Sequence, residues 1–178
     1  MREISSQARL LPNATPRLHF RLLDDSDAEF VLALLNEPDW LKYIGDKNVH
    51  TLEDALAYIH TGPLAMFAQQ GFCLSLVERI QDGVPLGLCG LLQRESLQWP
   101  DIGFAFAQRY HGRGIAFEAA TATLKHAKET LGLTKVAAIT ALNNEASMGL
   151  LSKLGFTLQD KTALPGHDEP SNLFLKIL

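Results

Sequence analysis

Short apolar stretches predict strands along the whole chain. Residues 17–22 alternate between apolar and polar side chains, which is typical of a strand with one exposed face. Residues 72–80 and 85–93 are rich in apolar side chains and flank Asp82-Gly83, a pair that favours a tight turn, so they predict a β-hairpin. Further strands are predicted at residues 101–107, 135–142, 156–160 and 173–178.

The turn at Asp82-Gly83 also sets an expected register for the hairpin. A two-residue turn there places Cys73 opposite Leu92 and Cys89 opposite Leu76. The two cysteines of the chain therefore do not face each other. Two reduced thiols in the core are favoured over a disulfide.

Capping signatures predict two helices between the first strand and the hairpin. Ser26-x-x-Glu29 precedes an apolar run and predicts a helix from about residue 27 to residue 36, ending before Pro38. Thr51-x-x-Asp54 predicts a second helix through about residue 60, ended by Gly62-Pro63.

The segment from Asp101 to Gly132 runs from strand to glycine loop to helix without a break. Its loop contains Gly112 and Gly114, and from Ile115 onward apolar residues recur at helical spacing. The first N–H groups of a helix have no intrahelical acceptor, and glycine lets a ligand approach them closely. The junction therefore predicts a binding site for an anionic group.

Several short motifs resemble one enzyme family. Arg109-x-x-Gly112-x-Gly114-x-Ala116, placed between a strand and a helix, resembles the acyl-CoA loop of the GNAT N-acetyltransferases. Three further motifs look like the ribosomal-protein N-terminal acetyltransferase-like (RimJ/RimL-type) branch: Thr15-Pro16-Arg17-Leu18, Asn144-x-x-Ser147 and Lys153-Leu154-Gly155-Phe156. The resemblance covers about residues 15–178 and is most specific in the centre.

The resemblance implies an α+β chain with the three-layer α/β/α GNAT fold. Its sheet would be mixed and mostly antiparallel, with about seven strands and a splayed parallel pair near residues 101–107 and 135–142. Residues 15–178 would form a single acetyltransferase domain, and residues 1–14 a loose N-terminal arm.

The resemblance also implies acetyl-CoA as co-substrate, with no metal. In the family the splayed strands receive the pantetheine arm, and the glycine loop binds the diphosphate. The residues of this sequence at those positions are Phe104, Phe106, Ala107, Gln108, Arg109, His111, Gly112, Arg113, Gly114, Ile115, Ala116, Asn144 and Ser147. For Asn144 an ordinary N-cap of the next helix is an equal alternative, and Arg109 and Arg113 could simply face solvent.

Asp101 is the predicted general base, because it opens the strand that borders the cleft, where some members of the superfamily carry a glutamate. The alternatives for Asp101 are a surface strand end or a strand-start cap. Glu95 and Glu118 are weaker candidates, and Glu118 also suits the first turn of a helix without any chemistry. Many relatives place a tyrosine, as proton donor to the departing thiolate, where this chain has Leu151. Ser147 is therefore the predicted donor, and an ordinary helix residue is its alternative.

The acceptor side is less defined. The resemblance implies that the first two helices and their connection form one wall of the acceptor site. Trp40 and Tyr43 are therefore candidate substrate contacts, with a role in the core as the alternative. An α-amine with a pKa of about 7.7–8.0 needs only a weak base, whereas a lysine at about 10.4 needs more help. Protein N-termini and small-molecule amines both stay open as acceptors.

Composition limits the remaining alternatives. A net charge of −4 and a pI near 5.8 disfavour a nucleic-acid partner. The absence of a signal-peptide pattern and of an apolar run of about 20 residues predicts a cytoplasmic protein without membrane contact. The sequence does not fix the oligomeric state, and both a monomer and a homodimer stay open. The alternative function is a non-catalytic acyl-CoA binding or sensing domain. A dinucleotide-binding enzyme is disfavoured, since the glycine loop lies late and lacks the Gly-x-Gly-x-x-Gly spacing.

Overall fold

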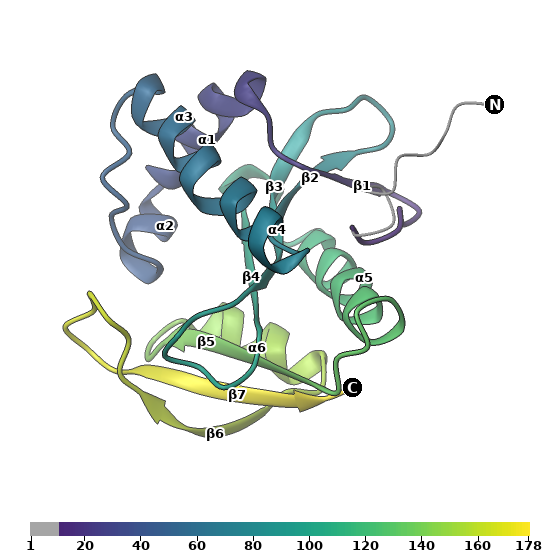
Figure 1. Ribbon diagram of the computed structural model, residues 1–178, viewed down its shortest axis with the longest axis vertical. Helices are drawn as coiled ribbons and strands as arrows, with labels where there is room; N and C mark the ends of the chain where they lie inside the picture. Colours follow the sequence, from purple (N-terminus) through teal and green to yellow (C-terminus); the bar gives the residue numbers. More distant parts are fainter. Residues whose placement is uncertain (1–10) are drawn as a thin grey trace.

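The computed structural model describes residues 11–178, which form one mixed sheet with helices on both faces (Figure 1). The strands of this part of the chain are β1 Leu18–Arg21, β2 Leu74–Arg79, β3 Pro85–Leu92, β4 Asp101–Phe106, β5 Lys135–Ala141, β6 Thr157–Thr162 and β7 Ser171–Ile177. The α-helices are α1 Ala28–Leu35, α2 Pro38–Tyr43, α3 Leu52–Ile59, α4 Ala65–Gln70, α5 Ile115–Glu129 and α6 Glu145–Lys153. The first ten residues of the predicted N-terminal arm lie outside the described residues.

The strand order confirms the predicted α+β fold with a splayed parallel pair. The seven described strands lie in the order β1-β2-β3-β4-β5-β7-β6, and each neighbouring pair is antiparallel except β4 and β5. These two run parallel but share a single paired position, Asp101 opposite Ala137. Beyond it, from Ile102 to Phe106, the edge of β4 that faces β5 has no strand partner among the described residues. Its backbone groups on that side are therefore open to a ligand, apart from the Phe106 carbonyl, which accepts from His111.

Helices bury both faces of the β1–β4 half of the sheet. On one face, α1 and α3 pack against Leu76 and Leu88. On the other, α5 packs against Val77 and Cys89. Neighbouring residues of a strand thus serve opposite faces, as strand geometry requires. A third apolar cluster joins α5 and α6 to β5 and β7, so α5 links the two halves of the sheet.

The hairpin register differs by one residue from the predicted one. Cys89 lies opposite Ser75 rather than Leu76, because Arg79 pairs with Val84 and makes the loop four residues long instead of two. The bulge between Val77 and Glu78 then shifts the register back by one residue. An extra residue on one strand of a pair moves each position beyond it relative to its partner, and turn residues alone do not reveal this. Both cysteines are buried and free, so the predicted reduced core thiols are confirmed.

The first helix begins with a different cap from the predicted one. The predicted capping box of Ser26 and Glu29 is wrong. The observed cap is at Asp24, whose side chain accepts from the Ser26 amide, while the Asp27 side chain accepts from the Asp24 amide. A 3-10 turn at Asp25–Asp27 thus precedes α1. The predicted Thr51–Asp54 box is confirmed at the start of α3.

Of the two helix ends that proline predicted, the first is confirmed, since α1 ends at Leu35, before Pro38. Pro38 opens α2 in its first turn, where its missing N–H costs nothing. Gly62-Pro63 do not end the helical path after α3, since His60–Leu64 forms a π-helical turn that leads directly into α4. The wider π turn absorbs the proline without breaking the path.

Candidate active site

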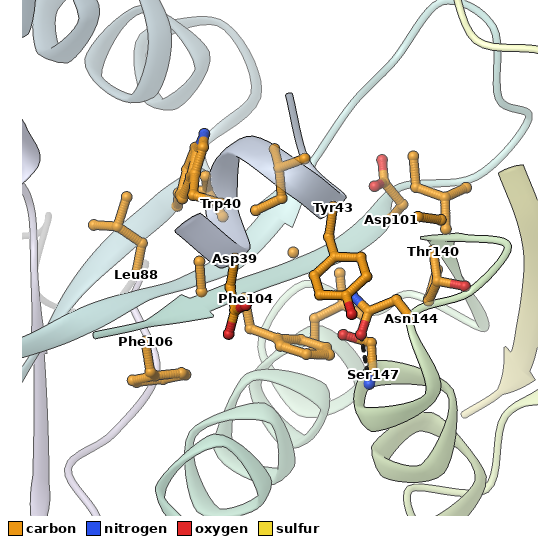
Figure 2. Close-up of a pocket in the computed structure, with 18 of the residues that line it drawn as sticks. Asp39, Trp40, Tyr43, Leu88, Asp101, Phe104, Phe106, Thr140, Asn144 and Ser147 are labelled. Atoms are coloured by element: carbon orange, nitrogen blue, oxygen red, sulfur yellow. Dashed lines mark hydrogen bonds between the residues drawn. The ribbon is translucent and has the colours of Figure 1, made fainter. Parts of the chain in front are cut away.

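A cleft of about 1410 Å³ opens where β4 and β5 diverge. Its walls come from these strands, the loop before α5, helices α2, α4 and α6, and the connection between β6 and β7. It collects most of the site residues that the sequence predicted, namely Trp40, Tyr43, Asp101, Phe104, Phe106, His111, Gly112, Gly114, Ile115, Ala116, Asn144 and Ser147 (Figure 2).

The glycine loop presents backbone donors at one end of this cleft. Gly112 and Gly114 have φ angles of 73° and 74°, a conformation that glycine adopts at little cost. Gly114 is also the N-cap of α5, and no side chain caps that helix. Within residues 11–178 the amides from Gly112 to Ala116 donate to no acceptor. Consecutive free donors at a helix N-terminus suit a phosphate group.

Contacts with the start of the chain hold this loop in place. Arg17 donates to the Arg113 carbonyl at 3.0 Å and pairs with Glu118 at 2.7 Å, and Thr15 also donates to Glu118. Burial would raise the pKa of Glu118, but the hydrogen bonds from Thr15 and Arg17 outweigh it and lower that pKa. Glu118 is thus engaged in holding the loop rather than placed to act as a base.

Four of the predicted cofactor residues do not line the cleft: Ala107, Gln108, Arg109 and Arg113. The Gln108 amide donates to Glu37 at 2.9 Å, which ties the loop to the turn before α2. Arg109 is exposed and lies over the Tyr110 ring, and Arg113 is exposed as well. Their predicted role in cofactor binding stays a prediction, whereas the backbone of Gly112 and Gly114 faces the cleft.

His111 closes the end of β4. Its Nε2 lies 2.7 Å from the carbonyl oxygen of Phe106. A carbonyl only accepts, so Nε2 carries a hydrogen and donates in this contact. The ring therefore stiffens the turn between the strand and the glycine loop, in addition to lining the cleft.

Asp101 lies in the cleft beside a cation that the sequence reading missed. Its side chain is 1% exposed, which rules out the surface strand end considered above. Arg94 Nε lies 3.2 Å from each carboxylate oxygen. Burial raises the pKa of Asp101 to about 6, although the charge and hydrogen bond of Arg94 partly oppose that rise. A carboxylate tuned in this way can accept a proton near neutral pH.

Two more side chains near Arg94 also escaped the sequence reading. Lys47 is an exposed residue, yet burial of its ammonium group lowers its pKa, and the nearby charge of Arg94 lowers it further. Burial raises the pKa of Tyr58 to about 12, with Arg94 acting in the opposite direction. The signal for Arg94 was its position: it follows β3 at the end that pairs Leu92 with Asp101.

Asn144 and Ser147 lie on the opposite wall, at the start of α6. The Asn144 side chain accepts from the Ser147 amide at 3.2 Å, so its alternative as an N-cap is confirmed. Both residues also line the cleft, and a ligand contact by Asn144 stays a prediction. Leu151 is 1% exposed and offers no hydroxyl at the position where many relatives have tyrosine. Glu95 is exposed and lies outside the cleft lining.

Trp40 and Tyr43 behave differently although both belong to α2. Trp40 is 5% exposed and packs in the core under α1 and α3, and its buried Nε1 has no acceptor among residues 11–178. Tyr43 is half-buried and directs its ring toward the side of the cleft that holds Asn144 and Ser147 (Figure 2). Of the two predicted acceptor contacts, Tyr43 is the one that is placed to meet a ligand.

Comparison with known proteins decides the family. A family model described as an acetyltransferase (GNAT) domain matches residues 17–157. The chain belongs to the GNAT acetyltransferase family. This GNAT protein is therefore an acyltransferase, as the resemblance of its loop and flanking motifs indicated.

Two curated proteins of Bacillus subtilis are similar to this GNAT chain over most of its length. It is 27% identical to the uncharacterized N-acetyltransferase YoaA over 144 residues, and this alignment covers 80% of each chain. It is 31% identical over 147 residues to the uncharacterized protein YkkB, which covers 79% of this chain and 82% of that one.

Solved structures share the GNAT fold. An acetyltransferase from Agrobacterium tumefaciens has a TM-score of 0.79 and 21% identity, with 94% of this chain and 95% of that chain covered. RimL, a ribosomal L7/L12 alpha-N-protein acetyltransferase in complex with coenzyme A, has a TM-score of 0.78 and 18% identity, with 93% and 97% covered. The fold of this chain is thus similar to that of RimL, a protein of the RimJ/RimL-type branch that the sequence motifs resemble.

The described residues offer neither a cluster of metal ligands nor a membrane-spanning helix. Residues 11–178 contain no group of three or more His, Cys, Asp or Glu side chains arranged to hold a metal ion. No helix in that range is both long and apolar enough to span a bilayer.

Proposed function

We propose that this GNAT acetyltransferase takes its acetyl group from acetyl-CoA and transfers it directly to a primary amine. One observation carries the proposal: the open edge of β4, the glycine loop with its unengaged amides at Gly112 and Gly114–Ala116, and the buried carboxylate of Asp101 line the same cleft. A thioester donor and an amine acceptor need such neighbours, namely a diphosphate site, an extended track and a base.

The residues present fit coenzyme A along its length. The amides from Gly112 to Ala116 suit its diphosphate, since they combine free donors with the positive end of the α5 dipole. The free side of β4 from Ile102 to Phe106 suits the amides of the pantetheine arm, by the pairing that an added strand would make. A structural neighbour, RimL, is in complex with coenzyme A, which supports the same use here.

The proposed chemistry requires one proton acceptor and one proton donor. The amine nitrogen attacks the thioester carbonyl carbon, a C–N bond forms, the C–S bond breaks, and the amine loses a proton. Asp101 accepts that proton directly or through water, because its pKa of about 6 leaves it ionised at pH 7. Ser147, which lines the cleft opposite, donates a hydrogen bond to the departing sulfur.

The test is acceptor-dependent release of thiol from acetyl-CoA by the full chain. We expect release with at least one class among amino acids, peptide N-termini, lysine side chains and polyamines, together with an acetylated product one acetyl group heavier by mass spectrometry. Reactions without acceptor control for hydrolysis. Calorimetric binding of coenzyme A without turnover on any class would instead indicate a binding or sensing domain. Absence of coenzyme A binding would reject the proposed cofactor itself.

A further inference from the structure

We infer that the acceptor of this site is a small amine that carries an anionic group, a carboxylate or a phosphate, held by Arg94 and Lys47 next to Asp101. This inference rests on the proposed transfer to an amine and names the class of that amine. It comes from three features of one part of the cleft: the geometry of Arg94, the local balance of charge, and the short distance between the two functions.

Arg94 uses only part of its guanidinium to hold Asp101. Its Nε lies 3.2 Å from both carboxylate oxygens, while its two terminal nitrogens have no acceptor within residues 11–178. The Arg94 side chain is 35% exposed and lines the cleft, so these terminal donors are within reach of a ligand. Guanidinium groups bind carboxylates and phosphates through two parallel hydrogen bonds. A half-used guanidinium in a cleft is therefore suited to recognise an anion.

The charges around Arg94 do not cancel. Lys47 lines the same cleft and lies close enough to Arg94 for the two like charges to disfavour each other. In the described part of the chain, Asp101 is the one carboxylate paired with Arg94, and Lys47 forms no ion pair. Arg94 and Lys47 together carry two positive charges, and Asp101 supplies one negative charge beside them. About one positive charge is left for a ligand to neutralise.

The rest of the cleft contains other acidic side chains, and these do not neutralise the pair. Besides Asp101, the acidic residues that line the cleft are Glu37 before α2, Asp39 in α2, Glu145 in α6, and Asp168 and Glu169 between β6 and β7. No ion pair links any of them to Arg94 or Lys47 in residues 11–178. Tyr58 also senses the Arg94 charge, and burial raises its pKa to about 12, so its hydroxyl stays neutral. The positive region is therefore local to the end of the cleft at Asp101.

The spacing restricts how far the anion stands from the amine. The terminal nitrogens of Arg94 belong to the same planar group as the Nε that contacts Asp101, so both lie within a few bond lengths of the proposed base. An acceptor whose nitrogen delivers its proton to Asp101 must then carry its anionic group only a few bonds away. α-Amino acids and short aminoalkyl phosphates meet this condition, whereas polyamines do not.

The experiment compares paired acceptors with the full chain and saturating acetyl-CoA. One pair sets L-amino acids against their primary amides, and the other sets O-phosphoethanolamine against ethanolamine. The first pair reports a carboxylate and the second a phosphate, so the two arms distinguish the sources of negative charge. We expect thiol release with a higher kcat/KM for the anionic member of at least one pair, and a preference that falls as salt screens the attraction.

Substitution of Lys47 separates recognition from proton transfer, because no ion pair or hydrogen bond joins Lys47 to Asp101 in the described residues. Lys47→Gln should reduce the anionic-to-neutral preference by about fivefold, mainly through KM, and Lys47→Arg should retain it. Comparing variants cancels the different intrinsic reactivities of the paired amines. Lys125→Gln removes an equal charge from a 67% exposed side chain of α5, outside the cleft lining, and should change nothing.

A second readout does not depend on turnover. Calorimetry should show N-acetylated L-amino acids or N-acetyl-O-phosphoethanolamine binding the protein saturated with coenzyme A, about fivefold more weakly in Lys47→Gln. Two results would overturn this inference while the proposed transferase function stands. One is turnover of neutral or cationic amines with equal or better efficiency, and the other is an anionic-to-neutral preference that is unchanged in Lys47→Gln. Anion binding lost in Lys47→Gln, but with no turnover of any amine, would support the anion site and count against the transferase function.

Discussion

At the scale of single residues, the Asp101 carboxyl is set by two opposed effects. Burial at the start of β4 disfavours its charge, and Arg94 favours it, with a net pKa of about 6. A buried carboxylate without a cation would lose its charge near neutral pH, and an exposed one would be too weak a base. The pair Asp101 and Arg94 thus places the proton affinity of this group in the useful range.

The first prediction is a pH dependence of the rate governed by Asp101. The activity kcat/KM should fall as pH decreases through about 6, because protonation removes the base. Asp101→Asn should lower kcat/KM by about 10²–10⁴-fold and abolish that limb. Arg94→Gln should move the limb to higher pH, since the guanidinium lowers the pKa of Asp101. The measurement is a set of pH–rate profiles. An unchanged limb in Asp101→Asn would assign it to another group.

The second prediction concerns stability and follows from the same carboxyl. Its pKa is raised from 3.8 to about 6 on folding, so the folded state binds more protons than the unfolded state between these values. The contribution of Asp101 to stability is therefore greatest below pH 4 and is lost as pH rises through about 6. The loss is on the order of 3 kcal/mol.

Chemical denaturation at pH 4 to 8 measures this contribution. The wild-type free energy of unfolding should fall with rising pH relative to Asp101→Asn, whose side chain does not titrate. Asp54→Asn is a useful comparison, because Asp54 is a helix cap with its pKa lowered by hydrogen bonds from His50 and Thr51. Because its lowered pKa places its titration below this pH range, Asp54→Asn should keep the wild-type fall with rising pH. Parallel curves for Asp101→Asn and Asp54→Asn would contradict the assignment to Asp101.

At the scale of elements, the glycine loop depends on two parts of the chain that are distant in sequence. Arg17 in the segment before β1 holds the Arg113 carbonyl, and Glu37 before α2 holds the Gln108 amide. Neither contact uses an amide between Gly112 and Ala116. They fix the loop without occupying its donors, which is a form of preorganisation for an anion.

The third prediction tests this loop with two matched glycine substitutions. Gly114→Ala and Gly132→Ala each place a Cβ at positive φ, 74° and 67°, and neither meets an atom closer than 3.6 Å. Each should cost about 1–2 kcal/mol of stability through backbone strain. Only Gly114→Ala should weaken coenzyme A binding by calorimetry, since Gly132 lies after α5. Equal affinity in both variants would mean that the loop does not bind the diphosphate.

Local patterns predicted the elements better than their exact pairing. Apolar runs and turn residues located the seven strands, and the Thr51–Asp54 box located α3. The bulge after Val77 and the cap at Asp24 were missed, since both depend on which of several equivalent local hydrogen bonds the packed chain selects. Arg94 was missed for a related reason: its partner Asp101 becomes a neighbour only once β3 and β4 pair.

At the scale of the whole molecule, the cleft arises because the sheet separates into two halves. The β1–β4 half is packed by α1, α3 and α5, and the β5–β7 half by α5 and α6. The two halves share one apolar cluster near their paired position, through Leu91 of β3 and Ile102 of β4, while the rest of the β1–β4 half packs in clusters of its own. Beyond that position β4 and β5 can therefore diverge without exposing a core. The apolar pattern of β4 does not reveal its unpaired edge, and only the resemblance to GNAT proteins predicted the splay.

The fourth prediction is that coenzyme A bridges the two halves and slows hydrogen exchange at specific amides. Segments 102–106 and 112–116 should gain protection, because one lies along the open edge of β4 and the other carries the free donors. The β6 strand, which lies outside the cleft lining, should not change. Ligand at about 100 times its Kd adds about 2.7 kcal/mol of stability, or roughly 5–10 °C in Tm for a chain of this size.

Exchange must be compared at matched global stability to make that result decisive. A ligand that binds anywhere on the folded state slows exchange at all amides that open by global unfolding. Protection confined to 102–106 and 112–116, measured at amides that exchange by local fluctuation, therefore reports contact and not mass action. Pantetheine, which lacks the diphosphate, should protect 102–106 but leave 112–116 exchanging as in the free protein. Uniform protection by both ligands would instead place the binding energy outside the splayed strands and the glycine loop.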